Sequence, residues 1–118
     1  MRRDDDFARD LLFRMEAQDD YYFMNVETLD SDLDDQKERY HLLLLEDAGL
    51  VVRATSAAHS FRLTNSGHDF IEVTRNDTVW IRVKDVAANA GGATLKMLGE
   101  IAVQLAKRKL LEATGMEI

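Results

Sequence analysis

The side chains that could perform acid–base or metal chemistry are three histidines and many carboxylates. His41, His59 and His68 are well separated, and the chain has no cysteine. Catalysis needs a nucleophile beside a base, a bound metal, or two carboxylates held apart in a pocket. His68 and Glu72 have the i, i+4 spacing of two ligands on one helix face, but no second histidine lies in register to complete a zinc site. We therefore expect no enzyme activity, no catalytic residues, no metal and no cofactor.

Two other patterns resemble ligand sites but lack the residues that such sites need. The aspartates at positions 30, 32 and 34 imitate the start of an EF-hand calcium loop. That loop requires glycine at its sixth position and glutamate at its twelfth, and these positions hold Asp35 and His41. Gly91 and Gly92 are not followed by the Lys-Ser or Lys-Thr of a phosphate-binding loop. Neither calcium nor nucleotide binding is expected.

The formal net charge of −7 is unevenly distributed along the chain. Residues 1–60 carry 15 acidic and 7 basic side chains, and residues 61–118 carry 7 acidic and 8 basic ones. Proteins bind DNA by neutralising phosphates with Lys and Arg, so the acidic half disfavours contact with DNA. Arg9, Asp10 and Arg14 interrupt the apolar run that a signal peptide or membrane span needs. Together with the absence of cysteine, this predicts a soluble cytoplasmic protein with no membrane segment.

The elements that would position these side chains are centred on residues 31–64. Ser31 can cap a helix over residues 32–48, with Asp34 as a short capping-box acid. The inward face of this helix is rich in leucine and centres on His41, which we expect to be a buried imidazole bonded to backbone. Gly49 would end the helix as a left-handed cap. The outward face is predicted to consist of Gln36, Arg39, Leu43 and Asp47, with Tyr40 at its margin.

A β-hairpin is predicted after this helix. The runs at 50–55 and 61–64 are rich in strand-forming residues, and a small polar loop at 56–60 joins them, with His59 solvated at the tip. Before the central helix, the 3.6-residue period predicts a helix over 4–17, and the aromatic residues 21–23 predict a strand or extended connection. After the hairpin, Thr64 can cap a helix to residue 73, Asp77 can cap or continue it to residue 87, and Thr94 can start a last helix to about residue 113.

Helix, glycine and hairpin in this order are typical of a winged helix. We predict an α+β, mostly helical, winged helix-turn-helix-like fold with a short hairpin wing. Residues 1–118 form a single domain in this prediction, with a core at 1–75 that includes the wing at 50–64, and with C-terminal helices at 76–113.

The last helix is more apolar than one core contact requires. Its apolar residues cover an arc of about 240° on a helical wheel, against about 100° for one buried stripe. Gly99 should cost about 1 kcal/mol in a helix interior, which is easier to explain if another helix approaches it closely. We predict a homodimer, and the alternative is a monomer in which the first helix and residues 78–90 cover the arc. The predicted interface consists of Leu95, Leu98, Gly99, Ala102 and Ala106.

Four stretches of the chain resemble a known family. They are MRRDDDFARDLL at the start, YHLLLLEDAGLV at 40–51, FRLTNSGHDFIE at 61–72 and RNDTVWIRVK at 75–84. Together they resemble a small bacterial and phage family, domain-of-unknown-function family two-five-one-three. The resemblance implies a winged-helix-like domain often encoded near phage or prophage genes, and it implies no activity or catalytic residues. The chain departs from the pattern by a short wing and by Leu43, where a polar outward residue is expected.

Two classes of function fit this prediction. The first is DNA binding in the manner of a transcriptional regulator, which fold-level analogy ranks first. The central helix would enter the major groove and the wing would touch phosphate. The alternative is a protein-interaction or assembly module without a DNA surface, which the acidic side chains beside this helix favour. The partner is thus DNA or a protein, and the predicted contact residues are Gln36, Arg39, Tyr40, Leu43, Arg53 and Arg62.

Overall fold

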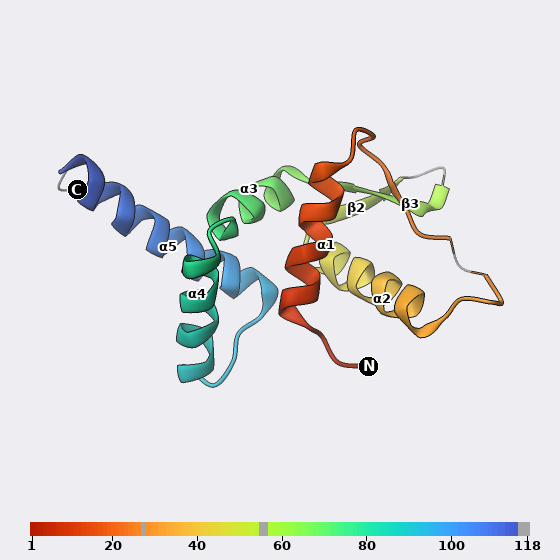
Figure 1. Ribbon diagram of the computed structural model, residues 1–118, viewed down its shortest axis with the longest axis horizontal. Helices are drawn as coiled ribbons and strands as arrows, with labels where there is room; N and C mark the ends of the chain where they lie inside the picture. Colours follow the sequence, from red (N-terminus) through yellow and green to blue (C-terminus); the bar gives the residue numbers. More distant parts are fainter. Residues whose placement is uncertain (27, 55–56, 116–118) are drawn as a thin grey trace. The chain divides into compact units, whose positions relative to one another are not determined.

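The computed structural model describes residues 1–26, 28–54 and 57–115 (Figure 1). It divides into two compact units, residues 1–71 and 72–118. The elements are, in order, α1 (Asp5–Ala17), β1 (Phe23–Met24), α2 (Leu33–Asp47), β2 (Val51–Ala54), β3 (Ala57–Leu63), α3 (Asn65–Thr74), α4 (Asp77–Asn89) and α5 (Leu95–Thr114).

The first unit contains a three-stranded antiparallel sheet in the order β1-β3-β2. β2 and β3 form the predicted hairpin, with Val51 opposite Leu63, and β1 pairs with the other edge of β3, with Phe23 opposite Phe61. Helices α1 and α2 pack against each other, α1 contacts β3, and α2 contacts β2. This arrangement confirms the predicted α+β, mostly helical fold, and it is compatible with a winged-helix-like arrangement.

The core of the first unit is formed by the stripes that the sequence periodicity predicts. In α1 the buried apolar residues recur every three or four positions, which places them on one face. Phe7, one turn before Leu11 on α1, is half-buried. The apolar side chains buried in this core include Ala8, Leu11, Leu12, Met15, Leu42, Leu45, Val51 and Phe61.

Both ends of α2 are closed by local hydrogen bonds. The cap is Asp32 and not the predicted Ser31, because Asp32 Oδ1 accepts from the Asp35 backbone N–H at 2.8 Å while Ser31 Oγ accepts from the N–H of Thr28. Gly49 ends the helix as predicted, with φ of 77°. The N–H of Leu50 donates to the carbonyl of Leu45 at 2.9 Å, which is the bond that defines a Schellman motif.

The hairpin loop is shorter than predicted. β3 begins at Ala57, so His59 lies within a strand and is exposed there, and the prediction that it occupies the wing tip is wrong. The reason is the third strand: the N–H of Asn25 donates to the carbonyl of His59 at 2.9 Å, which gives the start of β3 a partner on its other edge. Thr55, predicted at the end of the first strand, and Ser56, predicted in the loop, lie outside the described residues.

The remaining helices begin at caps that the sequence largely indicates. Thr64 Oγ1 accepts from the N–H of Gly67 at 3.0 Å at the start of α3, and Thr94 caps α5. The cap of α4 is Asn76 and not Asp77, because Asn76 Oδ1 accepts from the backbone N–H groups of both Thr78 and Val79. Asp77 is instead the first helical residue, where its charge suits the positive end of the helix dipole.

The second unit consists of the end of α3, α4 and α5, and α4 packs against α5. Its buried side chains include Trp80, Val83 and Ala87 on α4 and Leu95, Leu98 and Ala102 on α5. Within the described part of the chain, every helix is too short or too polar to cross a membrane.

Candidate macromolecule-binding surface

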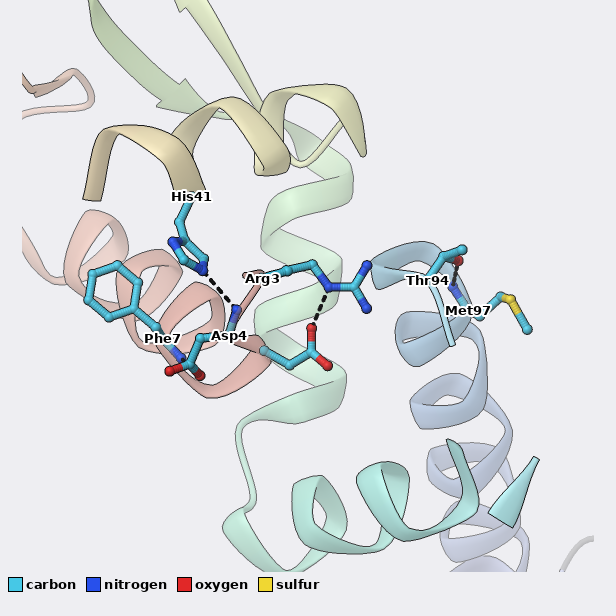
Figure 2. Close-up of polar contacts among 7 residues, drawn as sticks. Arg3, Asp4, Phe7, His41, Thr94 and Met97 are labelled. Carbon is cyan, nitrogen blue, oxygen red and sulfur yellow. Dashed lines mark hydrogen bonds and ion pairs between the residues drawn. The ribbon is translucent and has the colours of Figure 1, made fainter. Parts of the chain in front are cut away.

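His41 is a structural residue, as predicted, and is fully buried. Its Nε2 atom accepts from the backbone N–H of Asp4 at 2.9 Å (Figure 2). Its Nδ1 atom lies 2.8 Å from the carbonyl oxygen of Lys37. A carbonyl only accepts and a backbone N–H only donates, so these two contacts require the tautomer with the proton on Nδ1. Nδ1 thus bonds within α2, and Nε2 joins α2 to the start of α1.

This contact completes the cap of α1. Asp4 is the N-cap, and its Oδ1 atom accepts from the N–H of Phe7 at 3.0 Å. In a capping box the side chain at the position of Phe7 would accept from the N–H of the cap residue, but phenylalanine has no acceptor. His41 supplies it from another helix, with its ring 4.8 Å from that of Phe7. The pKa of Asp4 is lowered, chiefly by the hydrogen bond from the Phe7 N–H. Lys37, whose Nζ atom lies 3.3 Å from Asp4 Oδ2, lowers it further.

The outward face of α2 is less open than the wheel predicted. Gln36 is exposed, and its Nε2 atom donates to the carbonyl of Ser31 at 3.2 Å. Tyr40 and Leu43 are half-buried, and the Nε and Nη2 atoms of Arg39 are buried. A wheel gives the direction of a side chain but not the neighbours that cover it, which is why burial at these positions was missed.

Arg53, which was predicted to touch phosphate from the wing, is held by a carboxylate. Its Nε and Nη2 atoms donate to the two carboxylate oxygens of Glu46 at 2.8 and 2.9 Å. These hydrogen bonds and the charge of Glu46 raise the pKa of Arg53. A bidentate Arg–carboxylate pair uses the same fork of donors that would bind a phosphate.

Arg62, the other predicted wing residue, lies beside acidic groups. Its Nη1 atom donates to the carbonyl of Leu63 at 3.1 Å, and its side chain is exposed. It lines a pocket of about 390 Å³ whose other walls include Glu16, Asp19 and Asp20. Three acidic residues against one arginine in its lining make this pocket unfavourable for a phosphate group.

Sequence reasoning missed a group of exposed apolar side chains that extends from β1 to the first residue of α2. Leu29 has 106% of its reference surface exposed and Leu33 has 75%, and Met24 and Val26 are also exposed. Leu29 lies in a turn between Thr28 and Ser31. The Ser31 N–H donates to the carbonyl of Thr28, and the Thr28 N–H donates to the hydroxyl of Ser31. We call Met24, Val26, Leu29 and Leu33 the apolar strip.

Exposed carboxylates, which we call the acidic rim, accompany the C-terminal end of the apolar strip in the sequence. Asp30, Asp32, Asp34 and Asp35 are all exposed. The chain has no Lys or Arg between Arg14 and Lys37, and this absence was the sequence signal that could have found the surface.

The predicted dimer seam on α5 is largely inside the chain. Leu95, Leu98 and Ala102 are buried, while Gly99 and Ala106 are half-buried. Three of the five predicted positions therefore do not lie on the surface of a single chain. Trp80, Val83 and Ala87 of α4 form a matching buried stripe on the helix that packs against α5.

The histidines and acids of the described residues do not assemble into a metal site: within them, no group of three or more such side chains is placed to hold an ion. The sheet order and the packed helices α1 and α2 define an α+β protein whose arrangement is compatible with a winged helix.

Comparison with known proteins places the chain in a family. The family model described as "Hypothetical protein (DUF2513)" matches residues 2–93, so the chain belongs to this family of unknown function. An uncharacterized protein of Haemophilus influenzae is 29% identical over 90 residues, which cover 71% of this chain and 76% of that protein. No solved structure matches the chain significantly. The family match includes the apolar strip and ends two residues before α5 begins.

Proposed function

We propose that this protein is a non-enzymatic, protein-binding module on a winged-helix-like scaffold, and that its partner is a basic protein rather than DNA. The observation that carries the proposal is the exposed apolar strip together with the acidic rim, both of which reach the start of α2. In helix-turn-helix proteins the N-terminal residues of the recognition helix contact the base edges. Here that turn holds Asp32, Asp34 and Asp35, all of them exposed.

Electrostatics and desolvation both favour a protein partner over DNA. Carboxylates at this position repel the phosphates on both sides of a DNA groove. A basic protein surface would instead be attracted to the rim. Burial of Leu29 and Leu33 would then add apolar contact, which single exposed leucines offer to a protein but not to a phosphate backbone.

The arginines of the wing support the same proposal. Arg53 is paired with Glu46 through two hydrogen bonds, and two of the guanidinium nitrogens of Arg39 are buried. DNA could bind Arg53 only if its pair with Glu46 broke first, and it could bind the buried nitrogens of Arg39 only if they became exposed. Fold-level analogy to winged-helix regulators remains the argument for DNA.

A titration with labelled duplex DNA separates the two functions. We expect fluorescence anisotropy to give no binding up to about 10 µM protein at about 50 mM salt. Binding that weakens at least about tenfold at about 200 mM salt would contradict the proposal, because it would report phosphate contacts. Glu46→Gln releases Arg53 and removes one acid, and we expect it to bind DNA more than the wild type does.

The protein-binding arm uses a paired substitution on the apolar strip. Leu29→Ser with Leu33→Ser should leave the melting temperature nearly unchanged because both side chains are exposed. Affinity capture with quantitative mass spectrometry should then lose the basic proteins that the wild type retains. Val52→Ser on β2, another exposed apolar side chain, is the matched control. The proposal is wrong if the paired variant retains the same proteins as the wild type.

A further inference from the structure

The apolar stripe of α5 continues beyond the part that the chain buries. Leu95, Leu98 and Ala102 are buried in its first two turns. The same face continues through Ala106, which is half-buried, and Ala113, which is exposed, with the exposed Lys109 between them, and the helix ends at Thr114. About three helical turns, or roughly 18 Å, follow Ala102. A stripe that persists on an exposed helix needs another surface to cover it.

An open groove follows this second half of α5. It has a volume of about 740 Å³ and lies within the second unit. Val73 at the end of α3 and Val79 on α4 line it together with Ala106, Leu110 and Ala113 of α5. Leu110 has 62% of its surface exposed. An apolar centre of this kind is typical of a protein interface rather than of a surface that only faces water.

The charges at the edge of the groove distinguish between possible occupants. Lys109 and Glu112 both line it, three residues apart on α5, and Glu72 lines it from the end of α3. Glu72 is already paired with Arg75, whose Nη2 atom lies 2.7 Å from its Oε1 atom. A partner of one charge sign would meet a like charge at Lys109 or at Glu112. A helix that carries a basic and an acidic residue in the same order, but runs in the opposite direction, would place an opposite charge beside Lys109 and beside Glu112.

We propose that the groove is occupied by α5 of a second copy of the chain, in an antiparallel homodimer. In a two-fold pair, residue i contacts j and residue j contacts i. If the axis passes near Leu110, Lys109 of each copy lies beside Glu112 of the other. In this register Ala106 of one copy lies level with Gly115 of the other, about half a turn beyond Ala113, and small residues at the contact allow two helices to approach closely. This homodimer goes beyond the proposed function, because it uses the other unit of the chain and a different surface.

The proposal revises the predicted dimer seam and does not repeat it. Of the five residues predicted from the wheel, Ala106 lines the groove, and Leu95, Leu98 and Ala102 are buried in the single chain. The interface therefore moves about two turns towards the end of α5. Leu110 takes the role of the central apolar contact.

Analytical ultracentrifugation of the full chain tests the proposal. From about 1 to 200 µM, the mass should rise towards twice the chain mass of 13.5 kDa. Leu110→Asp should raise the dimer dissociation constant at least about tenfold, because it places a charge in the apolar centre. Gln104→Asp introduces the same charge at an exposed position on the opposite face and should change nothing. Circular dichroism should report equal helicity for all variants.

Charge reversal tests the register. Lys109→Glu alone and Glu112→Lys alone should each weaken the dimer, because each places like charges together across the two-fold axis. The double variant restores opposite charges on both sides and should return the dissociation constant to within about threefold of the wild type. A monomer at every concentration, a dimer unaffected by Leu110→Asp, or a double variant as weak as the single ones would each overturn the proposal. None of these outcomes depends on whether the apolar strip binds a protein.

Discussion

His41 is the residue that most directly joins distant parts of the first unit. It lies 37 residues from Asp4 in the sequence, yet it accepts the hydrogen bond from the backbone N–H that precedes α1. Tyr40 packs against its ring edge-on at 5.8 Å, and the Phe7 ring lies on another side. A buried N–H without this acceptor would lose its hydrogen bond to water and gain nothing in return.

Replacing His41 tests this contact. We expect His41→Phe to lower the free energy of unfolding by about 1–3 kcal/mol, because it leaves the Asp4 N–H buried without its acceptor. His41→Gln places an amide oxygen near the position of Nε2 and should lose less. Chemical denaturation of both variants measures the difference. A His41→Phe variant as stable as His41→Gln would mean that packing, and not the hydrogen bond, decides stability here.

The carboxylate of Asp4 predicts a pH dependence. Its pKa in the folded chain lies below the ordinary value of 3.8, chiefly because it accepts from the Phe7 N–H. A lowered pKa means that the folded state binds the proton less readily than the unfolded state does. The stabilisation by Asp4 is therefore present above pH 3.8 and is lost as pH falls through the lower pKa of the folded state.

Two variants separate the charge of Asp4 from its role as a cap. Asp4→Asn keeps a capping oxygen but cannot titrate, so its stability should fall less steeply than that of the wild type between about pH 5 and pH 3. Asp4→Ala should cost about 1 kcal/mol near neutral pH through loss of the cap. Urea denaturation at a series of pH values measures both. Parallel pH profiles for Asp4→Asn and the wild type would contradict the assignment.

At the scale of elements, one hydroxyl joins the end of α2 to the start of α3. Thr64 Oγ1 donates to the carbonyl of Gly49 at 2.6 Å and accepts from the N–H of Gly67 at 3.0 Å. The N–H of Thr64 also donates to the carbonyl of Leu50. The helix end, the hairpin and the next helix thus meet around a single side chain. The close packing at this point leaves no room for a side chain at Gly67.

Gly67→Ala should be strongly destabilising. A Cβ atom added at Gly67 would lie 2.1 Å from the carbonyl oxygen of Leu50, and backbone atoms cannot move aside as a flexible side chain does. We expect a loss of about 2–4 kcal/mol in the free energy of unfolding. Ser66→Ala, at an exposed neighbouring position of α3, should change stability by less than about 0.5 kcal/mol. Thermal and urea denaturation measure both variants. Helix propensity alone would make Gly67→Ala more stable than the wild type, and that result would contradict the close contact with Leu50.

At the scale of the whole molecule, charge separates the two units. Residues 1–71 hold 16 acidic and 8 basic side chains, whereas residues 72–118 hold 6 acidic and 7 basic ones. The negative charge that disfavours DNA therefore belongs to the winged-helix-like unit. The groove that we assign to a second copy belongs to the unit that is almost neutral, where self-association meets little overall repulsion. Partner binding and self-association are thus proposed for different units.

Several features follow from the sequence by itself because they depend on neighbouring residues. The end of α2 at Gly49 requires a positive φ that glycine adopts readily, and the stripe in α1 follows from a fixed helical period. Thr64 and Thr94 cap helices as predicted, because a threonine hydroxyl reaches the N–H groups that follow it. The order of helix and hairpin was sufficient to predict a winged-helix-like fold.

Only the tertiary structure decided which of these side chains form a surface. His59 lies in a strand because β1 returns to pair with β3, and Arg53 is held because α2 presents Glu46 beside β2. The stripe of α5 is divided into a buried half and an exposed half by packing within the chain, not by any change in its sequence period. Such contacts join residues that are distant in the chain, whereas local periodicity reports only the direction in which each side chain points.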